Sequence, residues 1–259
     1  MTSLPPCNLM KYTILDLAPG SSQFAARIDE ELMHYVVCKG PAAAIWEMPK
    51  GLVVPRTYKN SKTFNKALDV MHKKGWPVHI RHSGGGVVPQ GPGILNLSMA
   101  YAVNGLPLDN STNAYTQICD VISKSLSKFG LYTWPAAVEG SFCDGRFNLA
   151  CNFNGQARKI AGTAQLWRRI SHPTNGYTVQ VVLVHALLLV ECCIQEITNQ
   201  ANCLEELLGN SRRYKEDSAV SVQQLITNKH LINRSLSEAI SQELRHTISR
   251  IHAVETEVH

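Results

Sequence analysis

The sequence lacks the features of a secreted, membrane-spanning or disordered protein. Its 259 residues are 44% hydrophobic and 17% charged, which is a globular balance, and no low-complexity tract is present. Residues 1–11 contain no basic segment followed by an apolar run, which a secretory signal requires. The most apolar stretch, 179–190, is interrupted by Gln180 and His185 and is too short for a membrane helix. We therefore expect a cytoplasmic protein that makes no membrane contact.

Several common cofactor and metal motifs are also missing. The eight cysteines form no C-x-x-C pair, and neither the P-loop nor the G-x-G-x-x-G dinucleotide motif occurs. His79 and His82 are three residues apart on an expected strand, so they face opposite sides and we expect no metal site. The net charge of +5 falls short of the clustered basic surface of a dedicated nucleic-acid binder, so no nucleic-acid partner is expected.

The length predicts one large domain, or one domain with a small appendage. Expected strands are joined by both hairpins and helices as far as residue 192, and residues 193–259 have a helical pattern. This order favours an α+β fold, in which helices pack on a mixed sheet, over a doubly wound sheet or regular β/α repeats. The apolar periodicity and the flanking Gly, Pro, Asn and Ser residues predict helices over 24–39, 61–75 and 110–130, and strands over 42–47, 78–81, 94–102, 147–152, 159–168 and 177–190.

A glycine-rich segment follows the strand expected at 78–81. It reads Arg81-His82-Ser83-Gly84-Gly85-Gly86, and Gly93-Ile94-Leu95-Asn96-Leu97-Ser98 comes soon after it. Successive glycines allow a backbone to approach a ligand closely, and their N–H groups can hold an anion or a carbonyl oxygen. For an isolated glycine triplet, a flexible turn without a ligand is favoured somewhat over a binding site.

A second segment contains a cysteine and a lysine that could react together. Cys143 lies in an expected loop beside Asp144-Gly145, whereas Cys151, Cys192 and Cys193 lie in apolar surroundings where a thiol usually acts as a small hydrophobe. Lys159 belongs to the segment Arg158-Lys159-Ile160-Ala161-Gly162-Thr163-Ala164-Gln165. A nearby ammonium lowers the pKa of a thiol and binds an acyl oxygen. The spacing alone leaves open a buried thiol and a solvated amine without function.

Together the two segments resemble the lipoate-protein ligase and octanoyltransferase family, which shares a catalytic fold with biotin protein ligases and class II synthetases. Arg-x-Ser-Gly-Gly-Gly followed by Gly-x-Leu-Asn-x-Ser is similar to the acyl-pocket signature of that family, and Arg158–Gln165 is similar to its lysine motif. The resemblance extends from about Ile28 to about Val190 and does not cover the helical end. We expect a catalytic domain of this type over 1–192, with the helical portion 193–259 packed on the same domain. The resemblance also implies a substrate-binding set made of Arg81, His82, Ser83, Gly84, Gly85, Gly86, Asn96, Gly162 and Thr163.

Residues 141–149 are most similar to the branch that moves octanoyl groups between lipoyl-bearing proteins. In that branch the cysteine of a Ser-aromatic-Cys-x-Gly-x-aromatic-x-Leu segment is the nucleophile, which implies that Cys143 carries the acyl group as a thioester. Lys159 is then implied to orient and activate the acyl carbonyl. The implied partners are lipoyl-domain proteins, such as the H protein and dehydrogenase E2 subunits, or an acyl carrier protein. This reaction needs no cofactor.

Two alternative functions remain open. An ATP-dependent lipoate-protein ligase would use Lys159 with ATP and Mg²⁺ and would form no covalent enzyme intermediate. A non-catalytic module would bind the acyl group without turnover. The chain departs from the family pattern in two places: Pro89-Gln90 stands where many ligases have His-Asp, and Gln156-Ala157 separates Gly155 from Arg158. We expect the second departure to lengthen the hairpin turn before Lys159.

Overall fold

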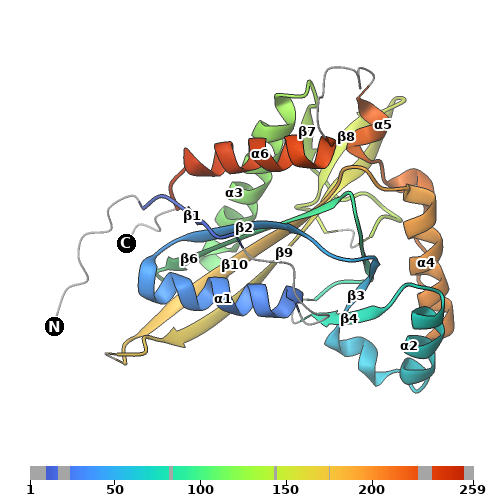
Figure 1. Cartoon of the computed structure of the whole chain (residues 1–259), viewed down its shortest axis with the longest axis horizontal. Helices are drawn as coiled ribbons and strands as arrows, with labels where there is room; N and C mark the ends of the chain where they lie inside the picture. The colour runs from blue at the N-terminus through green and yellow to red at the C-terminus, as the bar shows by residue number, and fades with distance from the viewer. Residues whose placement is uncertain are drawn as a thin grey trace.

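A mixed seven-stranded sheet forms the centre of the molecule (Figure 1). The computed structural model describes residues 10–16, 24–81, 84–142, 145–174, 176–226 and 235–253. Only the β1–β2 pair is parallel among the paired strands of this sheet. The strands follow the order β1 (Thr13–Ile14), β2 (Ala42–Glu47), β6 (Ile94–Val103), β10 (Thr178–Leu189), β9 (Gln156–Ser171), β8 (Leu149–Phe153) and β7 (Thr133–Pro135).

Helices cover both faces of this sheet, as Figure 1 shows. Successive strand residues point to opposite faces, so one chain segment supplies two cores. Ile45 and Leu97 belong to the core under α3 (Pro107–Ser127) and α6 (Leu236–Ser249). Ala44 and Ala100 belong to the core under α1 (Phe24–Lys39).

A smaller sheet lies on the same side of the large sheet as α1 (Figure 1). It has the order β4 (Val78–Arg81), β3 (Gly51–Pro55) and β5 (Val88–Gln90). Its core is completed by α2 (Phe64–Lys73) and α4 (Ile194–Leu207), which lie side by side in Figure 1. The remaining elements are short: η1 (Arg56–Asn60), η2 (Glu216–Ser218) and α5 (Val222–Leu225).

The predicted α+β class is confirmed, with helices packed on a mixed sheet. The helix expected at 24–39 forms there, and Gly40 follows it with φ +97°, a conformation that favours glycine. The third helix was placed too late, because α3 begins at Pro107, where a missing N–H costs a first turn nothing. No strand was predicted at 51–55 or 88–90, and β3 and β5 form there. No helix in the described ranges is long and apolar enough to cross a membrane.

Candidate active site

A pocket lies between the two sheets, and its floor is one face of the large sheet. Strand pairing places Trp46 of β2, Asn96 of β6, Leu187 of β10 and Gly162 of β9 side by side across that face. The next row on the same face contains Ala44, Ser98, His185 and Ala164. The pocket encloses about 870 Å³ of empty space, part of it open to solvent, and nearly all of the second row lines it.

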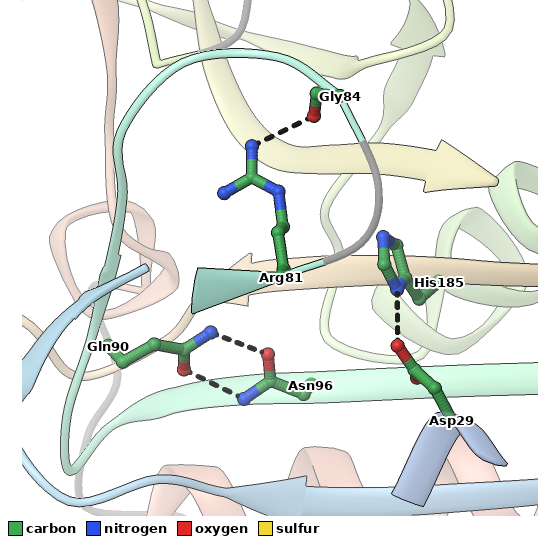
Figure 2. A network of polar contacts seen from close by, with 6 residues as sticks. All are labelled: Asp29, Arg81, Gly84, Gln90, Asn96 and His185. Atoms are coloured by element: carbon green, nitrogen blue, oxygen red, sulfur yellow. Dashed lines mark hydrogen bonds and ion pairs between the residues drawn. The ribbon is translucent and has the colours of Figure 1, made fainter. Parts of the chain in front are cut away.

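The smaller sheet and the glycine loop form the opposite wall. Val53, Arg81 and Gly84 line the pocket from that side. The guanidinium of Arg81 donates to the carbonyl oxygens of Val53, Gly84 and Gly86, at 2.9, 2.9 and 2.8 Å. Figure 2 shows the Arg81 side chain extended toward Gly84. Arg81 therefore holds the backbone at Gly84 and Gly86 as well as lining the pocket.

A bulge in β9 brings Lys159 onto the pocket face. Leu149 of β8 pairs with Ala161, but Ala150 pairs with Lys159, so Ile160 is an extra residue in β9. Without the bulge, Lys159 and Gly162 would face opposite sides of the sheet. With it, Ile160 and Ala161 both enter the core under α3, and Lys159 shares the pocket with Gly162.

The prediction of a longer hairpin turn before Lys159 is wrong. Phe153 pairs with Gln156, so the turn contains only Asn154 and Gly155, both at positive φ. Such two-residue turns match the twist of the flanking strands. Gln156 and Ala157 are therefore paired within the hairpin, and the bulge that follows places Lys159 at the pocket.

Lys159 is 3% exposed, and its ammonium is held between two backbone segments. It donates a hydrogen bond to the carbonyl oxygen of Phe142. A Cβ at Gly162 would lie 2.9 Å from Lys159 Nζ, so a larger residue there would force the end of the lysine side chain to move. Phe142 also lines the pocket and directly precedes Cys143 in the sequence.

Asn148 ties the segment after Cys143 to the same strand. Its Oδ1 accepts from the backbone N–H of Thr163 at 3.1 Å, and Asn148 is 1% exposed. Thr163 Oγ1 donates to the carbonyl oxygen of Phe147 at 2.7 Å. The segments on both sides of Cys143 are therefore attached to the part of β9 that contains Lys159 and Gly162.

Two further polar pairs lie within the pocket lining (Figure 2). The amides of Gln90 and Asn96 hydrogen bond reciprocally, at 2.9 Å in each direction. His185 Nδ1 lies 3.9 Å from Asp29 Oδ2, which α1 brings over the sheet. His185 therefore lies at the pocket with a carboxylate beside it.

Burial makes three of the described cysteine thiols weak acids. Burial raises the pKa of Cys151 to about 11, and burial together with the charge of Asp120 raises that of Cys119 to about 12. Burial also raises the pKa of Cys192 to about 12. These thiols stay protonated at neutral pH and are poor nucleophiles. Cys193 was expected in apolar surroundings, but it is exposed at the start of α4.

The predicted site residues fall into three groups. Arg81, Gly84, Asn96, Lys159, Gly162 and Thr163 line the pocket together. Gly85 and Gly86 belong to the loop but not to the pocket lining, and Gly86 packs instead against Tyr214. Cys143, His82 and Ser83 lie outside the described residues.

Sequence reasoning missed several lining residues, namely Asp29, Trp46, Gln90 and Ser98. Cross-strand pairing places Trp46 beside Asn96 and Ser98 beside His185, and this pairing joins strands that are distant in the sequence. Among the described residues, Ser98 Oγ is buried without a hydrogen-bond partner.

Comparison with known proteins gives a family for this chain. Residues 21–244 match the model of the family described as "Lipoyl protein ligase A/B catalytic domain". An uncharacterized protein of Cupriavidus necator is 42% identical over 248 residues, which are 93% of this chain and 98% of that protein. A protein of Kyrpidia tusciae named octanoyl-[GcvH]:protein N-octanoyltransferase is 26% identical over 81% of this chain and 71% of its own length.

Solved structures show the same fold. A lipoate-protein ligase A crystallised with ATP has a TM-score of 0.68 and 17% identity, covering 96% of this chain and 90% of its own. A putative lipoate protein ligase of Thermoplasma acidophilum with bound lipoic acid gives a TM-score of 0.65 at 17% identity, with coverage of 96% and 90%. At these identities the similarity establishes the architecture, not the reaction.

Proposed function

We propose that this chain, which belongs to the lipoyl protein ligase A/B catalytic domain family, is an acyltransferase. It moves an octanoyl or lipoyl group from a protein donor to a specific lysine of a lipoyl-domain protein. The acyl group passes through a thioester on Cys143. Lysine-bearing donors such as the H protein, and acceptors such as dehydrogenase E2 lipoyl domains, are the proposed partners.

The hydrogen bond from Lys159 to Phe142 is the observation that carries the proposal. Phe142 immediately precedes Cys143, so the only buried lysine of the described chain is bonded to the residue next to the proposed nucleophile. A cation held there favours the thiolate form of a neighbouring thiol. It also supplies a donor for the oxyanion that develops on the acyl carbonyl, and losing such a donor commonly costs about a hundredfold in rate.

The proposed reaction has two balanced steps. In the first, the Cys143 sulfur forms a bond to the acyl carbonyl carbon, the bond from that carbon to the donor breaks, and the donor atom takes up a proton. In the second, the acceptor lysine nitrogen bonds to the same carbon, the C–S bond breaks, and the proton from the amine returns to sulfur. Transfer from a thioester is downhill and transfer from an amide is nearly balanced, so neither needs ATP.

The pocket is suited to the carbon chain of the acyl group. Val53, Leu187 and Leu189 supply apolar lining, while Lys159 lies among the residues that border the same space. A mostly apolar cavity with a few polar groups that fix orientation is typical of small-molecule sites. We propose that the acyl chain occupies this pocket with its carbonyl toward Lys159.

The name of the Kyrpidia tusciae relative supports a transferase, because that protein is named for moving octanoyl from GcvH to another protein. An Anoxybacillus flavithermus protein with the same name is 27% identical over 209 residues. The lipoate-ligase structures share the fold but have at most 18% identity. The ligase reaction is therefore the competing outcome of the test.

The test is transfer to an apo lipoyl domain, assayed by mass spectrometry under two conditions. The first mixture contains an octanoylated H protein and no ATP, and the second contains free octanoate or lipoate with ATP and Mg²⁺. We expect a modified acceptor in the first mixture only. Modification in the second mixture alone would identify a ligase. Binding of the donor without a modified product in either mixture would identify a non-catalytic acyl-binding module.

A further inference from the structure

The segment after α4 packs its only described tyrosine against the glycine loop. Tyr214 is 5% exposed, and its phenolic oxygen accepts from the backbone N–H of Val87 at 3.0 Å. A Cβ at Gly86 would lie 2.5 Å from the same oxygen. The loop can approach Tyr214 this closely because Gly86 has no side chain.

The same tyrosine is anchored by a fully buried carboxylate. Glu205 of α4 is 0% exposed and accepts from Tyr214 Oη at 2.8 Å. It also accepts from Tyr58 Oη at 2.7 Å and from Asn210 Nδ2 at 2.6 Å. Burial and the neighbouring carboxylate raise the pKa of Tyr214 to about 12, so the phenol remains a donor at neutral pH.

The backbone of Tyr214 is fixed to α4 as well. Its N–H donates to Asn202 Oδ1 at 2.7 Å, and its carbonyl accepts from Asn202 Nδ2 at 2.9 Å. Both the ring and the backbone of Tyr214 are therefore held before any substrate binds.

The ring of Tyr214 also contacts Phe142, which lines the pocket. The rings of Phe142 and Tyr214 have their centroids 5.0 Å apart at an interplanar angle of 36°. Phe142 is the residue whose carbonyl accepts from Lys159. One side chain thus contacts both the glycine loop and the segment that binds the lysine.

We infer that Tyr214, anchored by Glu205, is a positioning residue that fixes the glycine loop relative to Phe142 and Lys159. Arg81 holds the carbonyls of Gly84 and Gly86, and Tyr214 holds the N–H of the next residue, Val87. The loop is consequently constrained from both sides. Only the expected effect on acyl transfer rests on the proposed function. The role of Tyr214 in holding the loop does not.

Tyr58 offers a matched control for the test. It donates to the same carboxylate oxygen of Glu205, but Val87 N–H donates to Tyr214 and not to Tyr58. Tyr58→Phe and Tyr214→Phe each remove one phenol from Glu205. Only Tyr214→Phe also removes the acceptor of the loop, together with the bond between the phenol and the Arg212 side chain.

Both variants are made in the full chain and compared with the wild type by hydrogen exchange of peptides covering 84–90, and by steady-state transfer. For Tyr214→Phe we expect exchange at Val87 to rise about tenfold, as for the loss of one hydrogen bond. We expect kcat to fall at least about tenfold because the loop shifts, while the KM for the acceptor domain stays within about twofold. Tyr58→Phe should stay within about twofold of wild type in all three quantities.

Equal effects of the two variants on loop exchange would overturn the inference, and so would faster exchange with an unchanged kcat. Gly86→Ala is a second test that keeps Tyr214 intact and pushes the loop away from it, and it should raise exchange and lower kcat in the same way. If the wild type transfers no acyl group, the proposed function fails. The exchange comparison still decides whether Tyr214 holds the loop.

Discussion

Lys159 and Gly162 depend on each other, because the lysine ammonium occupies the space where any other residue at 162 would place its Cβ. The separation from that Cβ position to Nζ would be 2.9 Å, and to Cε 3.0 Å. The bulge at Ile160 puts both residues on the pocket face. The observed position of the Lys159 ammonium therefore requires glycine at 162, because a larger residue would force the end of this side chain to move.

Gly162→Ala tests that requirement. The added methyl group displaces the Lys159 ammonium from Phe142, so we expect acyl transfer to fall about a hundredfold, close to the loss for Lys159→Ala. Gly162 has no positive φ, so alanine adds no backbone strain there. Thermal unfolding of Gly162→Ala should show that it folds. Transfer within a few-fold of the wild-type rate in a folded variant would show that the lysine position is not critical.

Asn148→Ala should destabilise the protein more than Thr163→Val does. Asn148→Ala removes the acceptor of the Thr163 N–H, and an unsatisfied amide of this kind costs about 1–3 kcal/mol. Thr163→Val removes a donor to the Phe147 carbonyl, which still accepts from Cys119 Sγ at 3.3 Å. Urea unfolding of the two variants measures the difference. Equal losses of unfolding free energy would mean that the Asn148 bond contributes no more than the Thr163 hydroxyl.

Glu47 should make stability fall as pH rises. Its pKa is raised above the ordinary value of 4.5, mainly by burial, with the charge of Glu191 adding to the effect. Between the ordinary value and the raised one, the folded protein retains a proton that the unfolded chain has released. Stability therefore decreases through that window as the pH increases.

Glu47→Gln replaces the titratable carboxyl group by an amide of nearly the same shape, which does not titrate. We expect the free energy of unfolding of the variant to increase relative to that of the wild type, meaning that the variant gains relative stability, as the pH is raised above 4.5. Denaturant unfolding at several pH values measures it. A difference that stays constant over this range would contradict a raised pKa at Glu47.

Local patterns were sufficient for the α+β class and for most long elements, including α1 and strand β2. The positions of β3 and β5 were not evident, since each is a short strand of three to five residues beside turns. The bulge at Ile160 was also hidden, because it depends on the register between β8 and β9. The hairpin turn before Lys159 was predicted, but its predicted length was wrong, because the length depends on the same register.

The pocket was predictable in part. The lysine motif and the glycine segment pointed to Lys159, Gly162 and Arg81, which do line one pocket. Asp29 and Trp46 could not be found in this way, since they reach the site from α1 and β2 through tertiary packing alone. Tyr214 and Glu205 were missed for the same reason, because their role appears only when the segment after α4 is folded against the glycine loop.

The most direct test of the proposed function is intact-protein mass spectrometry of the wild type and of Cys143→Ala, each mixed with an octanoylated donor protein without ATP. We predict an added octanoyl mass on the wild type that hydroxylamine removes, and no added mass on Cys143→Ala. Transfer to the acceptor should be lost in the same variant. A Cys143→Ala protein that transfers octanoyl at the wild-type rate, or a wild type that never carries the added mass while its acceptor is modified, would contradict the thioester.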